Sequence, residues 1–200
     1  MSLVACGRDR KADALDVLCD AFHDYPVMRY VLADAGAAYD SQLRRLIDFF
    51  CEARLTRRMP MYAKEVDGQF AAVALVSPPA EGDIPAELAR CYDDLIAVLG
   101  QAADTRMECY EAACEEAGDP GTPSHYLGVL GVASTHQRQG YGQQLVERAK
   151  QLVREDATSA TTSNSDLWLL VKPMPNTYTR GRCSGPPIEP AETAGATVCT

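Results

Sequence analysis

Between two apolar segments, the chain reads Gln137-Arg138-Gln139-Gly140-Tyr141-Gly142. The segment before it, Leu127 to Val132, is rich in Leu and Val and predicts a strand. The segment after it, Leu145 to Val153, has the apolar spacing of an amphipathic helix. Glycines let a backbone approach a ligand closely, and a helix N-terminus turns N–H groups and a partial positive charge toward an anion. A strand, a glycine turn and a helix in this order therefore predict a cradle for phosphate.

The composition predicts one globular domain over residues 1–200. Apolar residues make up 46% of the chain, and 200 residues are enough for a full core. The 19 basic and 28 acidic residues give a net charge of −9, which argues against a nucleic-acid partner, because such a protein needs a basic face. No segment has the ~20 apolar residues that span a membrane. We therefore expect a cytoplasmic protein without a membrane partner.

Two features suggest secretion, and the sequence argues against both. Leu3-Val4-Ala5-Cys6-Gly7 looks like a lipoprotein cleavage box, but only two residues precede it, whereas a signal needs an apolar stretch of ~7–15 residues. The eight cysteines are scattered without a Cys-x-x-Cys pair, and most fall on expected helix faces. We expect reduced, buried thiols and no metal site.

Helical spacing predicts two helices near the N-terminus. The first runs from Ala12 to Phe22 and ends ahead of Pro26, because proline disfavours the helical conformation in the residue before it. Asp40 is expected to cap the second helix. Its apolar face carries Leu43, Leu46, Ile47 and Phe50.

A β-hairpin and two further helices follow. Asp67-Gly68 joins the strands Met61 to Val66 and Gln69 to Val76, and Asp-Gly between β-rich segments is a strong hairpin signal. Residues 83–118 predict a helix with Asp83 as its cap, Pro85 in its first turn and Gly100 as its stop, and then a helix from Gln101 to Ala117.

The C-terminal part contains the glycine turn and one more strand. The strand His125 to Ala133 enters the turn, a helix from Gly142 to about Glu155 leaves it, and Leu167 to Val171 is a short apolar strand. Residues 173–200 are rich in Pro, Gly and Thr and have no period. Helices and strands in this order predict a mixed α/β domain with one core.

In order and spacing, Gln137 to Gly142 resembles the acyl-CoA signature, Gln/Arg-x-x-Gly-x-Gly/Ala, of the GCN5-related N-acetyltransferases (GNAT). The match covers residues 126–171, including the Leu-x-x-Leu-x-Val pattern that begins at Leu127. The resemblance implies an α/β, GNAT-like acyl-CoA N-acyltransferase fold, with a mixed twisted sheet whose splayed central strands are flanked by helices. The family often forms dimers, so the resemblance also suggests a homodimer.

The resemblance implies acetyl-CoA as the acetyl donor and indicates where it binds. Backbone groups of the strand before the turn would hold the pantetheine arm as an added strand. The N–H groups from Arg138 to Gln143 would hold the pyrophosphate, and the Arg138 guanidinium would pair with a phosphate. The expected donor-binding residues are Leu130, Gly131, Val132, Gln137, Arg138, Gln139, Gly140, Tyr141, Gly142, Gln143 and Asn176.

The family reaction is direct transfer to an amine, here the amine of a small molecule or a peptide. A base removes a proton from the amine, and an acid protonates the leaving thiolate. Histone-type relatives carry a catalytic Glu eleven residues before the motif Gln, where this chain has Tyr126. The adjacent His125 is the expected base, since imidazole suits proton transfer near neutrality. It has a second interpretation as an ordinary polar residue at a strand start. Tyr178 is the expected acid.

The chain departs from the family in two further places. Relatives continue with a helix and a Tyr-Glu-x-x-Gly-Phe-like segment, but here the pattern dissolves after Tyr178, either because those elements are replaced or because the chain end has been altered, for instance by a shifted reading frame. Residues 83–118 are a helical insertion relative to minimal members. We expect Leu88 to Glu116 to help wall the acceptor pocket.

Three other functions stay open. A dinucleotide site needs a third glycine and an acidic residue at the end of the next strand, where this chain has Leu145 and Lys172. A CoA-binding module without catalysis would account for the missing Glu and the atypical tail. A purely structural or interaction domain predicts no affinity for CoA.

Overall fold

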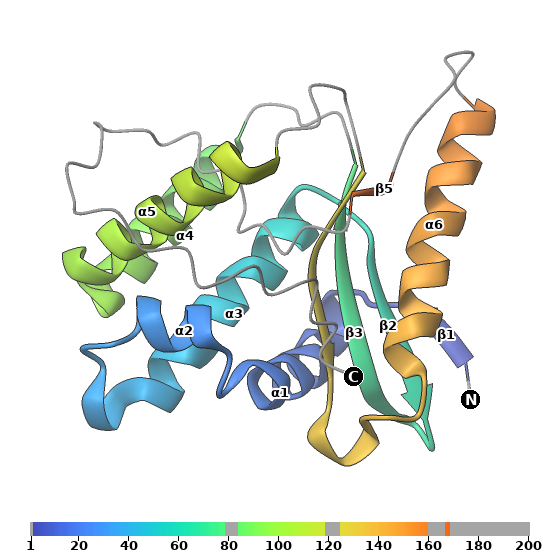
Figure 1. Ribbon diagram of the computed structural model, residues 1–200, viewed down its shortest axis with the longest axis horizontal. Helices are drawn as coiled ribbons and strands as arrows, with labels where there is room; N and C mark the ends of the chain where they lie inside the picture. The colour runs from blue at the N-terminus through green and yellow to red at the C-terminus, as the bar shows by residue number, and fades with distance from the viewer. Residues whose placement is uncertain (1, 79–83, 119–124, 160–166, 169–200) are drawn as a thin grey trace.

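A five-stranded sheet in the spatial order β1-β2-β3-β4-β5 divides the helices into two layers (Figure 1). The computed structural model describes residues 2–78, 84–118, 125–159 and 167–168. The first four strands pair antiparallel, and β4 and β5 pair parallel. The strands are β1 (Ser2–Ala5), β2 (Met61–Val66), β3 (Gln69–Ser77), β4 (His125–Val132) and β5 (Leu167–Trp168).

The helices are distributed unequally over the two faces of the sheet. One face carries α1 (Lys11–Phe22), α2 (Pro26–Val31), α3 (Tyr39–Thr56), α4 (Ala86–Leu99) and α5 (Gln101–Gly118), and α6 (Tyr141–Ser159) covers the other (Figure 1). Each layer has its own apolar cluster. Val73 and Leu75 of β3 pack with the helices α1 and α3, whereas Ala72 and Ala74 pack with α6. The alternation of side chains along β3 therefore builds both cores.

Local turn signals predicted their elements correctly. Asp67 and Gly68 have φ of 51° and 79°, which is the left-handed pair that a two-residue hairpin turn requires, and β2 and β3 flank them. Gly100 has φ of 85° at the end of α4, where the sequence predicted a stop.

Several predicted boundaries were wrong. Asp40 does not cap α3, because the helix begins one residue earlier and Ala38 occupies the N-cap position. Pro85 is the N-cap of α4 rather than a residue of its first turn. The helix α6 begins at Tyr141 rather than Gly142. Asp83 and residues 169–171 lie outside the described residues.

Two elements escaped the sequence patterns altogether. Residues Ser2–Ala5, which overlap the apparent cleavage box, form the edge strand β1 and pair with β2 from Ser2↔Glu65 to Ala5↔Tyr62. The segment after the first helix forms α2 instead of an extended break, with Pro26 in the first turn, where its missing N–H costs nothing. Both segments are too short to show a period.

The structure also locates the cysteines and the longest helices. Six cysteines fall in the described part of the chain and are not disulfide-bonded; Cys6 and Cys51 are buried, and Cys19, Cys91, Cys109 and Cys114 are half-buried. Among the described helices, none is both long and apolar enough to cross a lipid bilayer. The described residues contain no group of three or more His, Cys, Asp or Glu that could hold a metal ion.

Candidate functional site

The glycine turn joins the end of β4 to the start of α6. After Val132 the chain makes a short 3-10 helix, Ser134–His136, and then turns through Arg138 and Gly140, which have φ of 60° and 77°. The Gln137 side-chain amide donates to the Val132 carbonyl at 3.4 Å, which closes the loop onto the strand. The motif glutamine therefore shapes the turn.

The residues of this turn fit an anionic group. The N–H of Gln144 donates to the Gly140 carbonyl at 3.2 Å, and the N–H groups ahead of it in α6 have no carbonyl one turn earlier to bond. The first turn of α6 contains no acidic residue that would neutralise its positive end. A Cβ atom placed on Gly140 would meet nothing within 4 Å, so the turn is open on that side. The first turn of α6 therefore offers N–H donors, and no carboxylate of its own, to an anionic group.

Among the described residues, β4 enters this turn with one edge only partly paired. Leu130, Gly131 and Val132 pair with β3. On the other edge, within the described residues, β5 pairs only with His125 and Tyr126. The register between β3 and β4 shifts so that Gly128 is an extra residue on β4, a β-bulge. Beyond the bulge, the described residues give this edge of β4 no paired strand.

Gly131 brings α1 close to this part of β4. A Cβ atom on Gly131 would lie 2.9 Å from both Ala21 and Leu18 of α1, closer than real Cβ contacts. Only glycine therefore lets the helix pack directly on the strand at this position. The C-terminal end of α1 is thereby fixed next to the glycine turn.

A pocket of about 410 Å³ lies between the end of α1 and the glycine turn. This volume is within the range of small-molecule sites. The Asp20 carboxylate on the α1 side accepts a hydrogen bond from the backbone N–H of Ser134 at 2.6 Å. The pocket is lined by Asp20, Ala21, His23, Asp24, Tyr25, Pro26, Ser134 and Gln137. Gln137 is the only one of these residues that the sequence singled out as a donor-binding residue.

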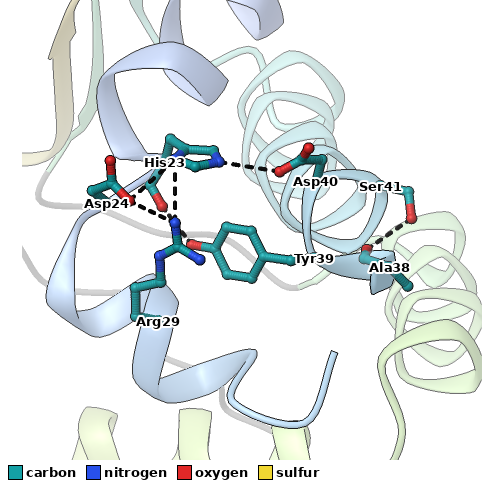
Figure 2. A network of polar contacts seen from close by, with 7 residues as sticks. All are labelled: His23, Asp24, Arg29, Ala38, Tyr39, Asp40 and Ser41. Carbon is teal, nitrogen blue, oxygen red and sulfur yellow. Dashed lines mark hydrogen bonds and ion pairs between the residues drawn. The ribbon is translucent and has the colours of Figure 1, made fainter. Parts of the chain in front are cut away.

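A polar network holds the corner between α1 and α2 that forms one wall of the pocket (Figure 2). The His23 ring lies 3.1 Å from Asp40 and 3.2 Å from Asp24, and the Tyr39 hydroxyl donates to the His23 carbonyl at 2.6 Å. Arg29 pairs with Asp24 and lies over the Tyr39 ring, 3.9 Å from its centroid. The hydrogen bond from Arg29, and then the neighbouring His23, lowers the pKa of Asp24. Asp40 thus pairs with His23 instead of capping its helix.

His125 and Tyr126, the two residues at the expected base position, have their side chains on opposite faces of the sheet. His125 is only 1% exposed, and it lies two residues before Leu127, which packs against α6. Because side chains alternate along a strand, His125 is on the α6 face and Tyr126 is on the face of α1 to α5. Burial is the main cause that raises the pKa of Tyr110 in α5, and Cys114, Tyr25 and Tyr126 nearby add to it. The helix α5 therefore lies close to Tyr126.

The structure places all of the predicted donor-binding residues except Asn176 next to one another. Leu130 to Val132 and Gln137 to Gln143 form one continuous strand-turn-helix unit. Asn176 and Tyr178 lie outside the described residues. The sequence did not identify Asp20, because nothing in the local pattern of α1 shows that its carboxylate meets a loop 114 positions later.

Comparison with known proteins identifies one matching family. The sequence model of the acetyltransferase (GNAT) family matches residues 21–167. No curated protein sequence matches the chain significantly. A solved structure titled histone acetyltransferase and related acetyltransferase, from Corynebacterium glutamicum, is 18% identical with a TM-score of 0.56, over 76% of this chain and 71% of that one. This likeness shows the fold.

A second solved structure is more distant. A GNAT-like decarboxylase in complex with isobutyryl-CoA is 15% identical with a TM-score of 0.39, over 77% of this chain and 60% of that one.

Proposed function

The chain belongs to the acetyltransferase (GNAT) family, and on that premise we propose that it transfers an acetyl group from acetyl-CoA to a primary amine. The glycine turn is the observation that carries the proposal. It presents the N-terminal N–H groups of α6, without a carboxylate in the first turn, beside a strand edge that an extended arm can join. In this proposal acetyl-CoA is a substrate, held by Leu130 to Val132 and Gln137 to Gln143, with Asn176 as a further contact.

The proposed reaction is a direct attack. The nitrogen of the neutral amine forms a bond to the thioester carbonyl carbon and gives up one proton to a base, the carbon–sulfur bond breaks, and the thiolate takes a proton from an acid. A backbone N–H of β4 next to the Gly128 bulge polarises the carbonyl oxygen. His125 as the base and Tyr178 as the acid stay predictions. Since His125 is buried on the α6 face, it would act on the amine through an intervening group rather than by direct contact.

We propose that the inserted helices α4 and α5 wall the acceptor side. Tyr110 of α5 lies near Tyr25 and Tyr126, and Arg106 of α5 donates to the Val31 carbonyl at 3.1 Å and pairs with Asp34 at 2.7 Å. These contacts join α5 to the last residue of α2 and to the segment after it. Deleting residues 88–116 is expected to raise the KM for the acceptor more than the Kd for CoA. Equal damage to both would contradict this role.

The direct test is incubation with acetyl-CoA and a panel of small-molecule and peptide amines while free thiol release is followed. Acetyl-CoA-dependent thiol release that needs one class of amine supports the proposal. Tight CoA binding without turnover on any amine would instead favour a CoA-binding module that has lost catalysis, for which Tyr126 at the usual Glu position is the supporting observation. A cytoplasmic homodimer remains part of the proposal, and sedimentation of the full chain tests the dimer.

A further inference from the structure

Lys64 is a largely buried lysine next to the first residue of α6. Its residue is only 6% exposed, although lysine is rarely buried without a partner. On β2 it lies between Tyr62 and Val66, which both pack in the α6 cluster, so its side chain is on the α6 face as well. Its ammonium lies 5.5 Å from the centroid of the Tyr141 ring, at the first residue of α6.

The strand register explains how the side chain reaches the turn. Lys64 pairs with Ala72 of β3, and Ala72 pairs with Val132, the last residue of β4. The register therefore places Lys64 two strands away from the residue after which the chain enters the turn. Tyr141, whose ring the ammonium faces, is itself 7% exposed.

Nothing negative in the described part of the chain compensates this charge. The adjacent Glu65 is on the other face of β2, where it pairs with Arg10 at 3.0 Å. Glu147, on α6, pairs with Lys150 at 2.9 Å. The only contact that the described residues give the Lys64 ammonium is the Tyr141 ring. A cation beside the positive end of a helix is unfavourable unless an anion joins it.

We propose that Lys64 is a donor-binding residue that supplies positive charge from behind the glycine turn to the diphosphate of the acyl-CoA. The inference rests on the proposed function and adds a residue from β2 to the site. The aromatic ring of Tyr141 holds the ammonium in place while the site is empty of anion. When the diphosphate binds at the N–H groups of the turn, the same ammonium balances its charge.

The test replaces the charge and keeps the shape. Lys64→Met is expected to weaken CoA binding in calorimetry by about tenfold, as the loss of one charge-assisted contact does, and Lys64→Arg is expected to retain most of the affinity. Lys150→Met makes the same change in net charge on the exposed side of α6 and is expected to leave CoA affinity within about twofold. Dephospho-CoA is expected to show the same loss with Lys64→Met, whereas pantetheine, which has no phosphate, is expected to show none.

Melting temperature separates this role from a structural one. Without ligand, Lys64→Met is expected to melt at or above the wild-type temperature, because it keeps an apolar stem and removes a cation from the positive end of a helix. Lys64→Gln serves the same comparison if the methionine variant does not fold. Lower CoA affinity together with lower ligand-free melting temperature, not restored by Lys64→Arg, would assign a structural role and overturn the inference.

Two further outcomes are distinguishable. If the wild type and Lys150→Met bind CoA and Lys64→Met binds it equally well, the assignment of Lys64 fails while the proposed function stands. If the wild type binds no CoA, the proposed function itself fails. If Lys64→Met weakens the binding of CoA but not of dephospho-CoA, Lys64 contacts the 3′-phosphate. That result would overturn the diphosphate assignment.

Discussion

The backbone N–H of Ser134 donates to the Asp20 carboxylate at 2.6 Å, and this bond joins the last turn of α1 to the loop that enters the glycine turn. Both residues line the pocket next to Gln137. The position of the predicted phosphate cradle thus depends on a helix that lies more than a hundred residues earlier in the chain. The first prediction follows from this bond.

Asp20→Ala is expected to weaken CoA binding by roughly fivefold, because the loss of one hydrogen bond of about 1 kcal/mol lets the loop move away from α1. Asp20→Asn keeps an oxygen acceptor for the Ser134 N–H and removes a negative charge near the cradle. It is expected to bind CoA at least as well as the wild type. Calorimetry on the two variants checks this, and equal affinities for Asp20→Ala and the wild type would rule the anchor out.

Gly131 gives a prediction for stability. Gly131→Ala places a methyl group 2.9 Å from Ala21 and Leu18, and Gly131→Val adds more volume at the same place. We expect the free energy of unfolding to fall by about 1–3 kcal/mol, with valine the more damaging, because an overpacked core must shift. Urea denaturation of both variants measures the effect. Unchanged midpoints would mean that α1 does not pack on β4 as described.

Turns and helix ends that depend on neighbouring residues could be predicted from the sequence. Pairing between distant segments could not. Asp67-Gly68 and Gly100 carry their conformations in their own residue types, so the hairpin and the end of α4 were predicted. The motif from Gln137 to Gly142 is also local. In contrast, β1 exists only because Ser2 meets Glu65 across the sheet, and four residues show no usable period.

The candidate site also has a part that is local in the sequence and a part that depends on contacts between distant segments. The proposed donor-binding residues from Leu130 to Gln143 are local in the chain, so a motif can indicate them as candidates. Asp20 and Lys64 come from other elements, and only the packed structure shows the contact of Asp20 with Ser134 and of Lys64 with Tyr141. Asp40 was wrongly predicted to cap α3, because a carboxylate near a helix start fits the capping pattern. In the structure its partner is His23, from a distant part of the sequence.

The base position yields a kinetic prediction. If His125 transfers the proton, His125→Gln is expected to lower kcat by at least about a hundredfold and to leave the Kd for CoA unchanged. Tyr126→Phe, at the adjacent position on the opposite face, is the matched variant and is expected to retain most of kcat. Steady-state rates and calorimetry give both numbers. The reverse pattern, with Tyr126→Phe the slower enzyme, would remove His125 from the reaction.

The buried thiols predict a loss of stability at alkaline pH. Burial is the main cause that raises the pKa of Cys51 to about 12 and that of Cys6 to about 11. The unfolded chain releases these protons near pH 9, so the folded state holds more protons between pH 9 and the raised values. The contribution of these two thiols to the free energy of unfolding is therefore complete below pH 9. It is lost as pH rises, at up to about 1.4 kcal/mol per pH unit for each thiol.

Chemical denaturation from pH 8 to 10.5 measures this slope. Cys51→Ala is expected to flatten it, whereas Cys91→Ala, at a half-buried position on α4, is expected to leave it unchanged. Identical slopes in the wild type and Cys51→Ala would contradict the assignment.

The central claim is that the glycine turn holds the diphosphate of an acyl-CoA. Its most direct test is calorimetry of CoA with Gly140→Asp and Gly140→Asn. Position 140 has φ of 77°, so both substitutions bear the same backbone strain, and a Cβ atom there meets nothing within 4 Å. The two variants differ only in charge. The account predicts that Gly140→Asp binds CoA at least about tenfold more weakly than Gly140→Asn, because a carboxylate repels the phosphates. Equal CoA affinities for the two variants would contradict it.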